Sequence, residues 1–249
     1  MELKRSVLGA VLVGAAAFSG NAFAGVTGNV GGVSEYVFRG IEQGDGGDAA
    51  IQGGLDYSAD SGFYVGLWGS NIDWGPGHVE TDIYAGFAGS AGDVSYDIGA
   101  LYYYYPEEDE NDFSPSANTI EGHVKLGYGP MSFTVYYSPK YFGAEKASGS
   151  DISEVYLNLA GSFPITESVS LDAAVGYTKL SDDFFGDGPN GVCKASNTSC
   201  DSKDDYLDYS VGVSKTIDDT LSASFSVVGT DFSGDKPKFL IGLKKSFDI

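Results

Sequence analysis

Hydrophobic and polar residues alternate along most of this chain. Between residues 79 and 89 the odd-numbered positions are mostly apolar, whereas the even-numbered positions include Glu80, Asp82 and Gly86. Successive side chains of a β-strand point to opposite faces, so alternation with a period of two predicts strands, and helical spacing fits none of these segments. The same alternation recurs in residues 120–128, 169–177 and 221–227.

Twelve such strands are predicted, and most of them have nine to thirteen residues. A tilted strand that crosses a membrane needs about 9–11 residues, so the lengths suit a membrane-spanning barrel. The predicted strands cover residues 28–40, 50–58, 62–73, 79–90, 93–105, 117–129, 131–141, 151–163, 167–179, 204–216, 220–232 and 236–248.

The connections between these strands alternate in length. Those after even-numbered strands are tight, as at Ala91-Gly92, and most of those after odd-numbered strands are longer and polar. All tight turns would then lie at one rim and the long loops at the other, with both termini on the side of the tight turns. Outer-membrane barrels have this layout, with short periplasmic turns and longer external loops. The longer connections cover residues 41–49, 106–116, 142–150 and 180–203.

A soluble β-sandwich or lipocalin-like barrel also shows such alternation, because its apolar faces point into a core and its polar faces point to water. Three features favour the membrane. The polar faces are rich in Gly, Ser and Ala, the last strand carries Phe247 near its end, and aromatic residues gather near both strand ends, as in the two aromatic girdles of a membrane barrel. We therefore predict an all-β fold, a single closed antiparallel transmembrane β-barrel of about 12 strands. The two expected girdles are Tyr57, Phe63, Phe87, Tyr128, Phe133 and Phe163 at the turn rim, and Tyr102, Tyr104, Tyr137, Tyr177 and Tyr209 at the loop rim.

The N-terminus resembles a secretory signal. Lys4 and Arg5 precede a short apolar run, and Ala22-Phe23-Ala24 fits an A-x-A cleavage site. A retained helical anchor is disfavoured, because the run is shorter than the roughly 20 residues that span a bilayer. We expect residues 1–24 to be a cleaved signal peptide, residues 25–249 to form the barrel, and the protein to reside in the bacterial outer membrane.

Composition narrows the range of partners. The chain has a net charge of −21, with 36 Gly, 17 Tyr and 15 Phe. Such acidity disfavours nucleic acid, whose phosphates are bound by Lys and Arg. The expected partners are outer-membrane lipid and lipopolysaccharide, together with small solutes or ions.

Cys193 and Cys200 lie in a segment rich in Asp, Asn, Ser and Gly. Export to an oxidising compartment favours a disulfide between them over a metal or redox site, since neither a nearby His nor C-x-x-C spacing is present. Calcium is conceivable at the acidic loops, residues 106–112 and 182–187. A solvated loop is the preferred interpretation, because the twelve-residue loop with its Gly and terminal Glu is missing. We expect no metal and no cofactor.

Several blocks near the start of the mature chain carry a family resemblance. Residues 34–40 read SEYVFRG, residues 52–57 read QGGLDY, and residues 62–71 read GFYVGLWGSN, followed by Glu80 and by DIYAG at 82–86. In order and spacing these blocks resemble the TorF family, a bacterial family of otherwise unknown function proposed to contain porins. The resemblance covers about the first 60 residues of the mature chain and implies an outer-membrane barrel that passes solutes.

If the apolar faces meet lipid, the charged side chains point into the lumen, because a Lys or Arg on the lipid face costs about 2–4 kcal/mol at the midplane. The predicted function is a porin-like channel for passive passage of small solutes or ions. Nine inward carboxylates against Arg39, Lys125 and Lys140 favour cations, with Glu80 and Asp82 as the key residues. The predicted pore-lining set is Glu35, Arg39, Gln52, Asp56, Glu80, Asp82, Asp97, Glu121, His123, Lys125, Lys140, Glu154, Asp172 and Asp208.

Two alternatives remain open. Arg39 and the lysines could neutralise neighbouring carboxylates and hold a structural or surface-interaction barrel shut, with inward aromatic side chains blocking the lumen. The second alternative is a barrel enzyme of the lipase or protease type. It requires Ser or Cys beside a His base, and neither His78 nor His123 lies in a recognisable Ser motif. We therefore expect no catalysis. The aromatic side chains expected to point inward are Tyr64, Trp68, Tyr84, Tyr103, Tyr105 and Tyr156.

Overall fold

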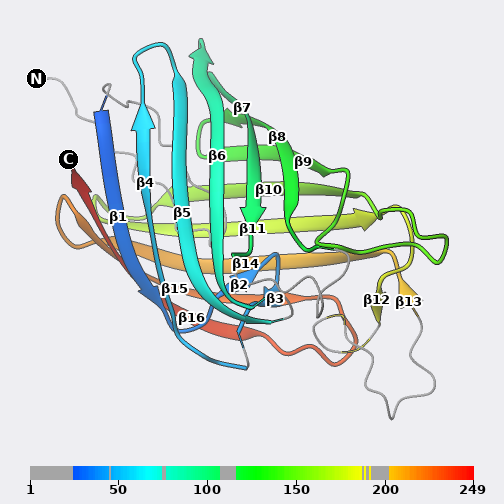
Figure 1. Cartoon of the computed structure of the whole chain (residues 1–249). Helices are drawn as coiled ribbons and strands as arrows, with labels where there is room; N and C mark the ends of the chain where they lie inside the picture. The colour runs from blue at the N-terminus through cyan, green and yellow to red at the C-terminus, as the bar shows by residue number, and fades with distance from the viewer. Residues whose placement is uncertain are drawn as a thin grey trace, which may run out of the picture.

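The computed structural model describes residues 25–44, 46–74, 77–106, 116–186, 188, 191 and 202–249. Within this part the chain forms one closed barrel of twelve antiparallel strands, which confirms the predicted fold (Figure 1). No helix among the described residues is long and apolar enough to span a bilayer. The wall strands are β1 (Gly25–Val33), β4 (Ala50–Ser58), β5 (Phe63–Trp74), β6 (Gly77–Ala91), β7 (Val94–Tyr104), β8 (Thr119–Tyr128), β9 (Met131–Ser138), β10 (Glu154–Pro164), β11 (Val169–Leu180), β14 (Asp205–Thr216), β15 (Leu221–Thr230) and β16 (Lys238–Asp248).

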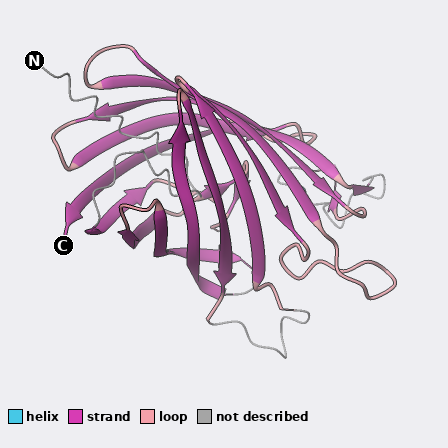
Figure 2. Ribbon diagram, turned by 90° about the horizontal axis from the view of Figure 1, so that it is seen from above, coloured by secondary structure: helices cyan, strands magenta, loops and turns pink. Residues whose placement is uncertain are grey.

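The barrel closes between its first and last strands. β1 pairs with β4 on one side and with β16 on the other, in a register that places Thr27 opposite Asp248 and Val33 opposite Gly242. Gly25 and Asp248 therefore lie at the same rim, the one with the tight turns. Figure 2 shows the strands winding around the enclosed space from a second direction. Closure satisfies the backbone hydrogen bonds of both terminal strands and leaves no open sheet edge.

Side chains alternate between the two faces of the wall as predicted. On β6, Glu80 and Asp82 are buried inside the barrel, whereas Val79 and Ile83 are exposed on its outer surface. Large apolar side chains cover the outer face of every wall strand, and ten of the eleven predicted girdle aromatics are among them. The eleventh, Tyr177, is half-buried, and its hydroxyl donates to Asp205 Oδ2 at 2.8 Å.

Two predicted strands run past the wall at the positions of predicted pore residues. β1 ends at Val33 and not at residue 40, so Glu35 and Arg39 do not lie on the wall. β9 ends at Ser138 and not at residue 141, because the Ser138 hydroxyl donates to the carbonyl oxygen of Lys140 at 2.6 Å and closes a turn. Lys140 therefore lies in a loop, half-buried, and the prediction of a wall position for these three residues was wrong.

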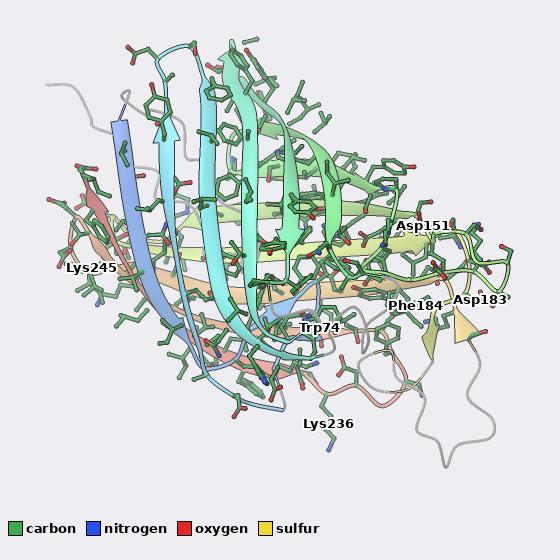
Figure 3. The ribbon with its side chains drawn as sticks, in the orientation of Figure 1. Trp74, Asp151, Asp183, Phe184, Lys236 and Lys245 are labelled. Atoms are coloured by element: carbon green, nitrogen blue, oxygen red, sulfur yellow. The ribbon has the colours of Figure 1, made fainter. Side chains whose placement is uncertain are left out.

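The packed interior lies toward the loop rim of the barrel. One apolar cluster contains Tyr36, Ile72, Tyr103 and Tyr105, and it lies against β5 to β7. A second contains Tyr141, Ile152, Leu180, Phe185, Tyr206 and Phe232, and Phe185 belongs to β12 (Phe185–Gly186), which pairs with β13 (Ser202–Lys203). Figure 3 shows Phe184 and Asp183 at this end, with Lys245 at the opposite end. The loop end is therefore the packed part of the barrel interior.

Candidate functional site

Residues 34–44, called the inner hairpin below, turn into the barrel after β1. They contain β2 (Val37–Phe38) and β3 (Ile41–Glu42), which lie within the outline of the barrel (Figure 1). The pairing of Phe38 with Ile41 leaves a two-residue turn, Arg39-Gly40, with φ of 48° and 81°. Positive φ at both positions defines a type I′ turn, the hairpin turn whose twist matches that of the strands. This geometry places Arg39 at the tip of the hairpin.

The Arg39 side chain joins the hairpin tip to two strands of the wall. Its Nη1 donates to Glu154 Oε1 on β10 at 2.8 Å, and its Nη2 donates to Glu121 Oε2 and Oε1 on β8 at 2.8 and 2.9 Å. The guanidinium also lies over the rings of Tyr156 and Tyr136, 4.1 and 5.1 Å from their centroids. The side chain is only 6% exposed. An arginine keeps its charge when buried, and its planar fork suits two carboxylates and aromatic faces at once.

Glu80 and Asp82 lie beneath the same hairpin. Glu80 accepts hydrogen bonds from the hydroxyls of Tyr36 at 2.7 Å and Tyr105 at 3.0 Å, and it is 2% exposed. Asp82, two residues further along β6, is also buried. The inward direction predicted for both is confirmed, yet neither faces an open lumen. Tyr36 on the hairpin therefore covers Glu80, one of the two residues expected to govern selectivity.

The turn and the second strand of the inner hairpin are held by a residue that the sequence reasoning missed. Lys238 Nζ on β16 lies 3.0 Å from Asp235 Oδ1 and 3.6 Å from Glu42 Oε1, and it donates to the carbonyl oxygen of Gly40 at 3.4 Å. The alternation along the sequence could have identified Lys238, because Lys238 shares the inward face of β16 with Leu240. Arg39 and Lys238 thus hold the hairpin by its turn and by β3.

Burial and charge shift two carboxyls near the hairpin in opposite directions. Burial, reinforced by the neighbouring charge of Glu42, raises the pKa of Glu35 above its ordinary value. Burial also acts to raise the pKa of Asp235, but bonds from the Thr230 hydroxyl and the Lys238 ammonium outweigh it and lower that pKa. Asp235 is therefore the anionic partner of Lys238.

Toward the turn rim the lumen is more evenly charged. Asp97 accepts a hydrogen bond from the Tyr64 hydroxyl at 2.7 Å, lies 3.3 Å from His123 Nε2 and pairs in register with Lys125. The partners of His123 here are thus a carboxylate and a phenol, as in a polar lining. Eleven of the fourteen predicted pore residues lie on inward faces of the wall: Gln52, Asp56, Glu80, Asp82, Asp97, Glu121, His123, Lys125, Glu154, Asp172 and Asp208.

Inward glycines allow tyrosine rings to lie flat against the wall. A Cβ on Gly86 would come within 2.3 Å of the Tyr64 hydroxyl, and one on Gly66 within 2.4 Å of the Tyr84 ring. These rings bring their hydroxyls to carboxylates, Tyr64 to Asp97 and Tyr84 to Asp56. The prediction that Tyr64 and Tyr84 point inward is therefore confirmed, and so is that for the buried Tyr103, Tyr105 and Tyr156.

Some predictions concern residues outside the described part of the chain. These are the signal peptide at residues 1–24, the Cys193–Cys200 disulfide and most of the acidic loop at 106–116. Within the described part, no group of three or more His, Cys, Asp or Glu side chains is arranged to hold a metal ion.

The solved structures that resemble this barrel include porins. The NanC porin is similar with a TM-score of 0.56 and 11% identity over 89% of this chain and 100% of its own. The KdgM porin is similar with a TM-score of 0.54 and 10% identity over 89% of this chain and 99% of its own. The same porin has been solved in complex with disordered oligogalacturonate, and that structure gives a TM-score of 0.53. At such low identity the likeness concerns the fold. No curated protein matches the chain.

The sequence also matches a family model over residues 16–246, nearly the whole chain. That family, Gcw_chp, is described as a bacterial protein of unknown function, in agreement with the expected membership of such a family. The TorF name itself stays a resemblance. The chain belongs to the Gcw_chp family of bacterial proteins.

Proposed function

We propose that this protein is an outer-membrane channel for passive passage of small solutes or ions, with the inner hairpin as its constriction. The observation that carries the proposal is a charged hairpin folded into a closed barrel, with its Arg39 tip bound to the opposite wall. A side chain so placed narrows any path along the lumen. The porins of similar fold support this interpretation.

The outer face of the barrel supports a membrane location. Ile51, Ile98, Val211 and Ile241 are more than half exposed, and similar side chains surround the barrel. Soluble monomers rarely expose continuous apolar surface of this extent. In the proposal this band lies against outer-membrane lipid, and the aromatic girdles and loop rim meet the headgroups and lipopolysaccharide.

Cation preference is the finer part of the proposal. The carboxyls of Glu80, Asp82, Glu121 and Glu154 gather around the inner hairpin, and Arg39 is the cation bound among them. Excess negative charge beside a low-dielectric wall concentrates cations and repels anions. Arg39 offsets part of this excess and leaves the constriction acidic.

The test is the reversal potential of the reconstituted protein in a salt gradient. Exchanging Glu80→Gln and Asp82→Asn together should reduce cation selectivity, because two carboxylates disappear while the shapes persist. Glu145→Gln removes a charge on an exposed loop and serves as the matched control. High salt should weaken the preference, since the Debye length falls to about 3 Å at 1 M. An anion-selective wild type would contradict the proposal and assign the filter to Arg39 and the lysines.

A second candidate is a barrel that the inner hairpin keeps shut. The observation that favours it is the fixation of this hairpin by two buried cations, Arg39 and Lys238. Such a barrel would have a structural or surface-interaction role. A wild type that conducts no ions would support this candidate against the channel.

A further inference from the structure

A cavity of about 120 Å³ lies inside the barrel beside the tip of the inner hairpin. Arg39, Tyr136 and Tyr156 line it at the hairpin end, and Asp208 and Asp172 line it along β14 and β11. A single water needs about 10–15 Å³ of such volume, so the cavity admits several waters or a short aliphatic chain.

Two carboxylate oxygens in this cavity have no hydrogen-bond partner among the described residues. Asp208 is 8% exposed, and its Oδ1 accepts from the Tyr156 hydroxyl at 3.2 Å, while its Oδ2 is buried and unpaired. Asp172 Oδ1 is buried and unpaired as well. Buried polar atoms are almost always paired, and an unpaired carboxylate oxygen is costly. A pair of such atoms in one cavity points to a ligand that supplies donors.

Arg39 does not satisfy these oxygens. Its two terminal nitrogens already donate to Glu121 and Glu154 on the other side of the hairpin tip. Among the described lining residues the remaining charges are the two aspartates, so the cavity favours a cation over an anion. Tyr136 and Tyr156 add ring faces that attract a cation or pack against an alkyl chain.

The two aspartates occupy different levels of the wall. Asp208 pairs in register with Gly176, and Asp172 pairs with Gly212, so the two levels are four residues apart along β11. At roughly 3.3 Å per residue this separates them by about 13 Å along the strand. Ala174 and Ser210 line the space between them. We infer that the cavity binds an elongated organic cation with an ammonium group at each end, an aliphatic diamine, whose ammonium groups donate to Asp208 and Asp172.

Each ammonium carries three donors and a full charge, which matches one unpaired carboxylate oxygen and neighbouring hydroxyls. A monoamine of the same length reaches only one aspartate. This inference rests on the proposed function, since the site would hold a cationic solute beside the constriction. Binding itself requires no conduction and is measured separately.

The experiment is isothermal titration calorimetry of the purified barrel in detergent at low salt. The probe is 1,5-diaminopentane, and the matched control is 1-aminopentane. We expect saturable binding of one diamine per chain, with the monoamine weaker by roughly ten- to a hundredfold, the range of one hydrogen bond to a charged group. Asp208→Asn and Asp172→Asn should each weaken diamine binding by a similar factor. Asp97→Asn is the control, because Asp97 is a lumen carboxylate already paired with Tyr64 and His123.

A variant that keeps both charges tests the cavity itself. Ala174→Leu places a larger side chain between the aspartates and should abolish diamine binding, provided that heat-modifiable migration on gels shows a folded barrel. Equal affinities for the two amines, or an equal loss in Asp97→Asn, would overturn the inference and indicate general attraction to an acidic lumen. Absence of saturation would overturn it too and leave water as the occupant. Diamine binding without ionic conductance would refute the channel alone, and conductance without binding would refute this site alone.

Discussion

Exchanging Arg39 for Asn removes the charge at the tip of the inner hairpin and keeps the turn. Arg39 has a φ of 48° and precedes Gly40, so Arg39→Asn gives the turn an Asn-Gly pair, the dipeptide that type I′ turns favour most. Asn tolerates the left-handed region better than Arg does. The substitution therefore isolates the loss of the guanidinium from any change in backbone shape.

The structure sets the size of the effect. Without the guanidinium, Glu121 and Glu154, which are 2% and 1% exposed, lose three hydrogen bonds of 2.8 to 2.9 Å together with their buried counter-ion, although Glu121 keeps the bond from the Tyr103 hydroxyl at 3.2 Å. Removing one partner of a buried ion pair costs about 3–5 kcal/mol. Replacing arginine by asparagine at this left-handed backbone position regains about 1 kcal/mol of conformational strain. The net loss of about 2–4 kcal/mol lowers the ratio of docked to undocked hairpin by roughly 30- to 700-fold.

The assay is single-channel recording in planar bilayers. Arg39→Asn should raise the conductance, because the hairpin no longer stays bound across the lumen, and should shift the reversal potential toward greater cation selectivity, because one positive charge is gone. Lys236→Asn removes a cation from an exposed loop at the rim and serves as the control (Figure 3). If Arg39→Asn conducts and selects like the wild type, the hairpin is not the constriction and the reasoning fails.

Three further predictions concern the barrel as a whole. The purified mature protein should require detergent and show heat-modifiable migration on gels, and a monodisperse preparation in plain buffer would contradict the membrane assignment. Exchanging Cys193 and Cys200 for Ser should leave assembly nearly unchanged, because a disulfide there would restrain only the loop segment that it encloses; failure to assemble would reveal another role. The pKa of Asp235 is lowered in the folded protein. Its ionised carboxylate therefore contributes to the free energy of unfolding above the ordinary aspartate pKa of about 3.9, and this contribution is lost as the pH falls through the lowered pKa. Thermal unfolding from about pH 7 to pH 3 should therefore depend less on pH in Asp235→Asn than in the wild type, and parallel curves would refute this.

The wall of the barrel was predictable because its signals are local. Each wall strand turns one face outward and the other into the barrel, so a period of two repeats along the chain, as on β6 from Val79 to Phe87. The tight turns, such as Ala91-Gly92, then set the direction of each following strand. These signals require no knowledge of distant contacts.

The inner hairpin was not predictable in the same way, because residues 34–40 fit a continuation of the wall strand before them. The end of β1 depends on β16 instead: Ser34 N–H donates to the carbonyl oxygen of Ile241, and Ile241 N–H donates to Ser34 Oγ, at the point where the chain leaves the wall. The partners of Arg39 are 82 and 115 residues away in sequence. Because the hairpin folds inward, Arg39 reaches Glu121 and Glu154 across the barrel.

The most direct test of the channel is the current through the refolded wild-type barrel in a planar bilayer. The lumen constricted by the inner hairpin should give steady, stepwise ionic conductance with a reversal potential on the cation side. Bilayers that contain folded, heat-modifiable protein and stay silent would contradict the account and favour a barrel that Arg39 and Lys238 hold shut.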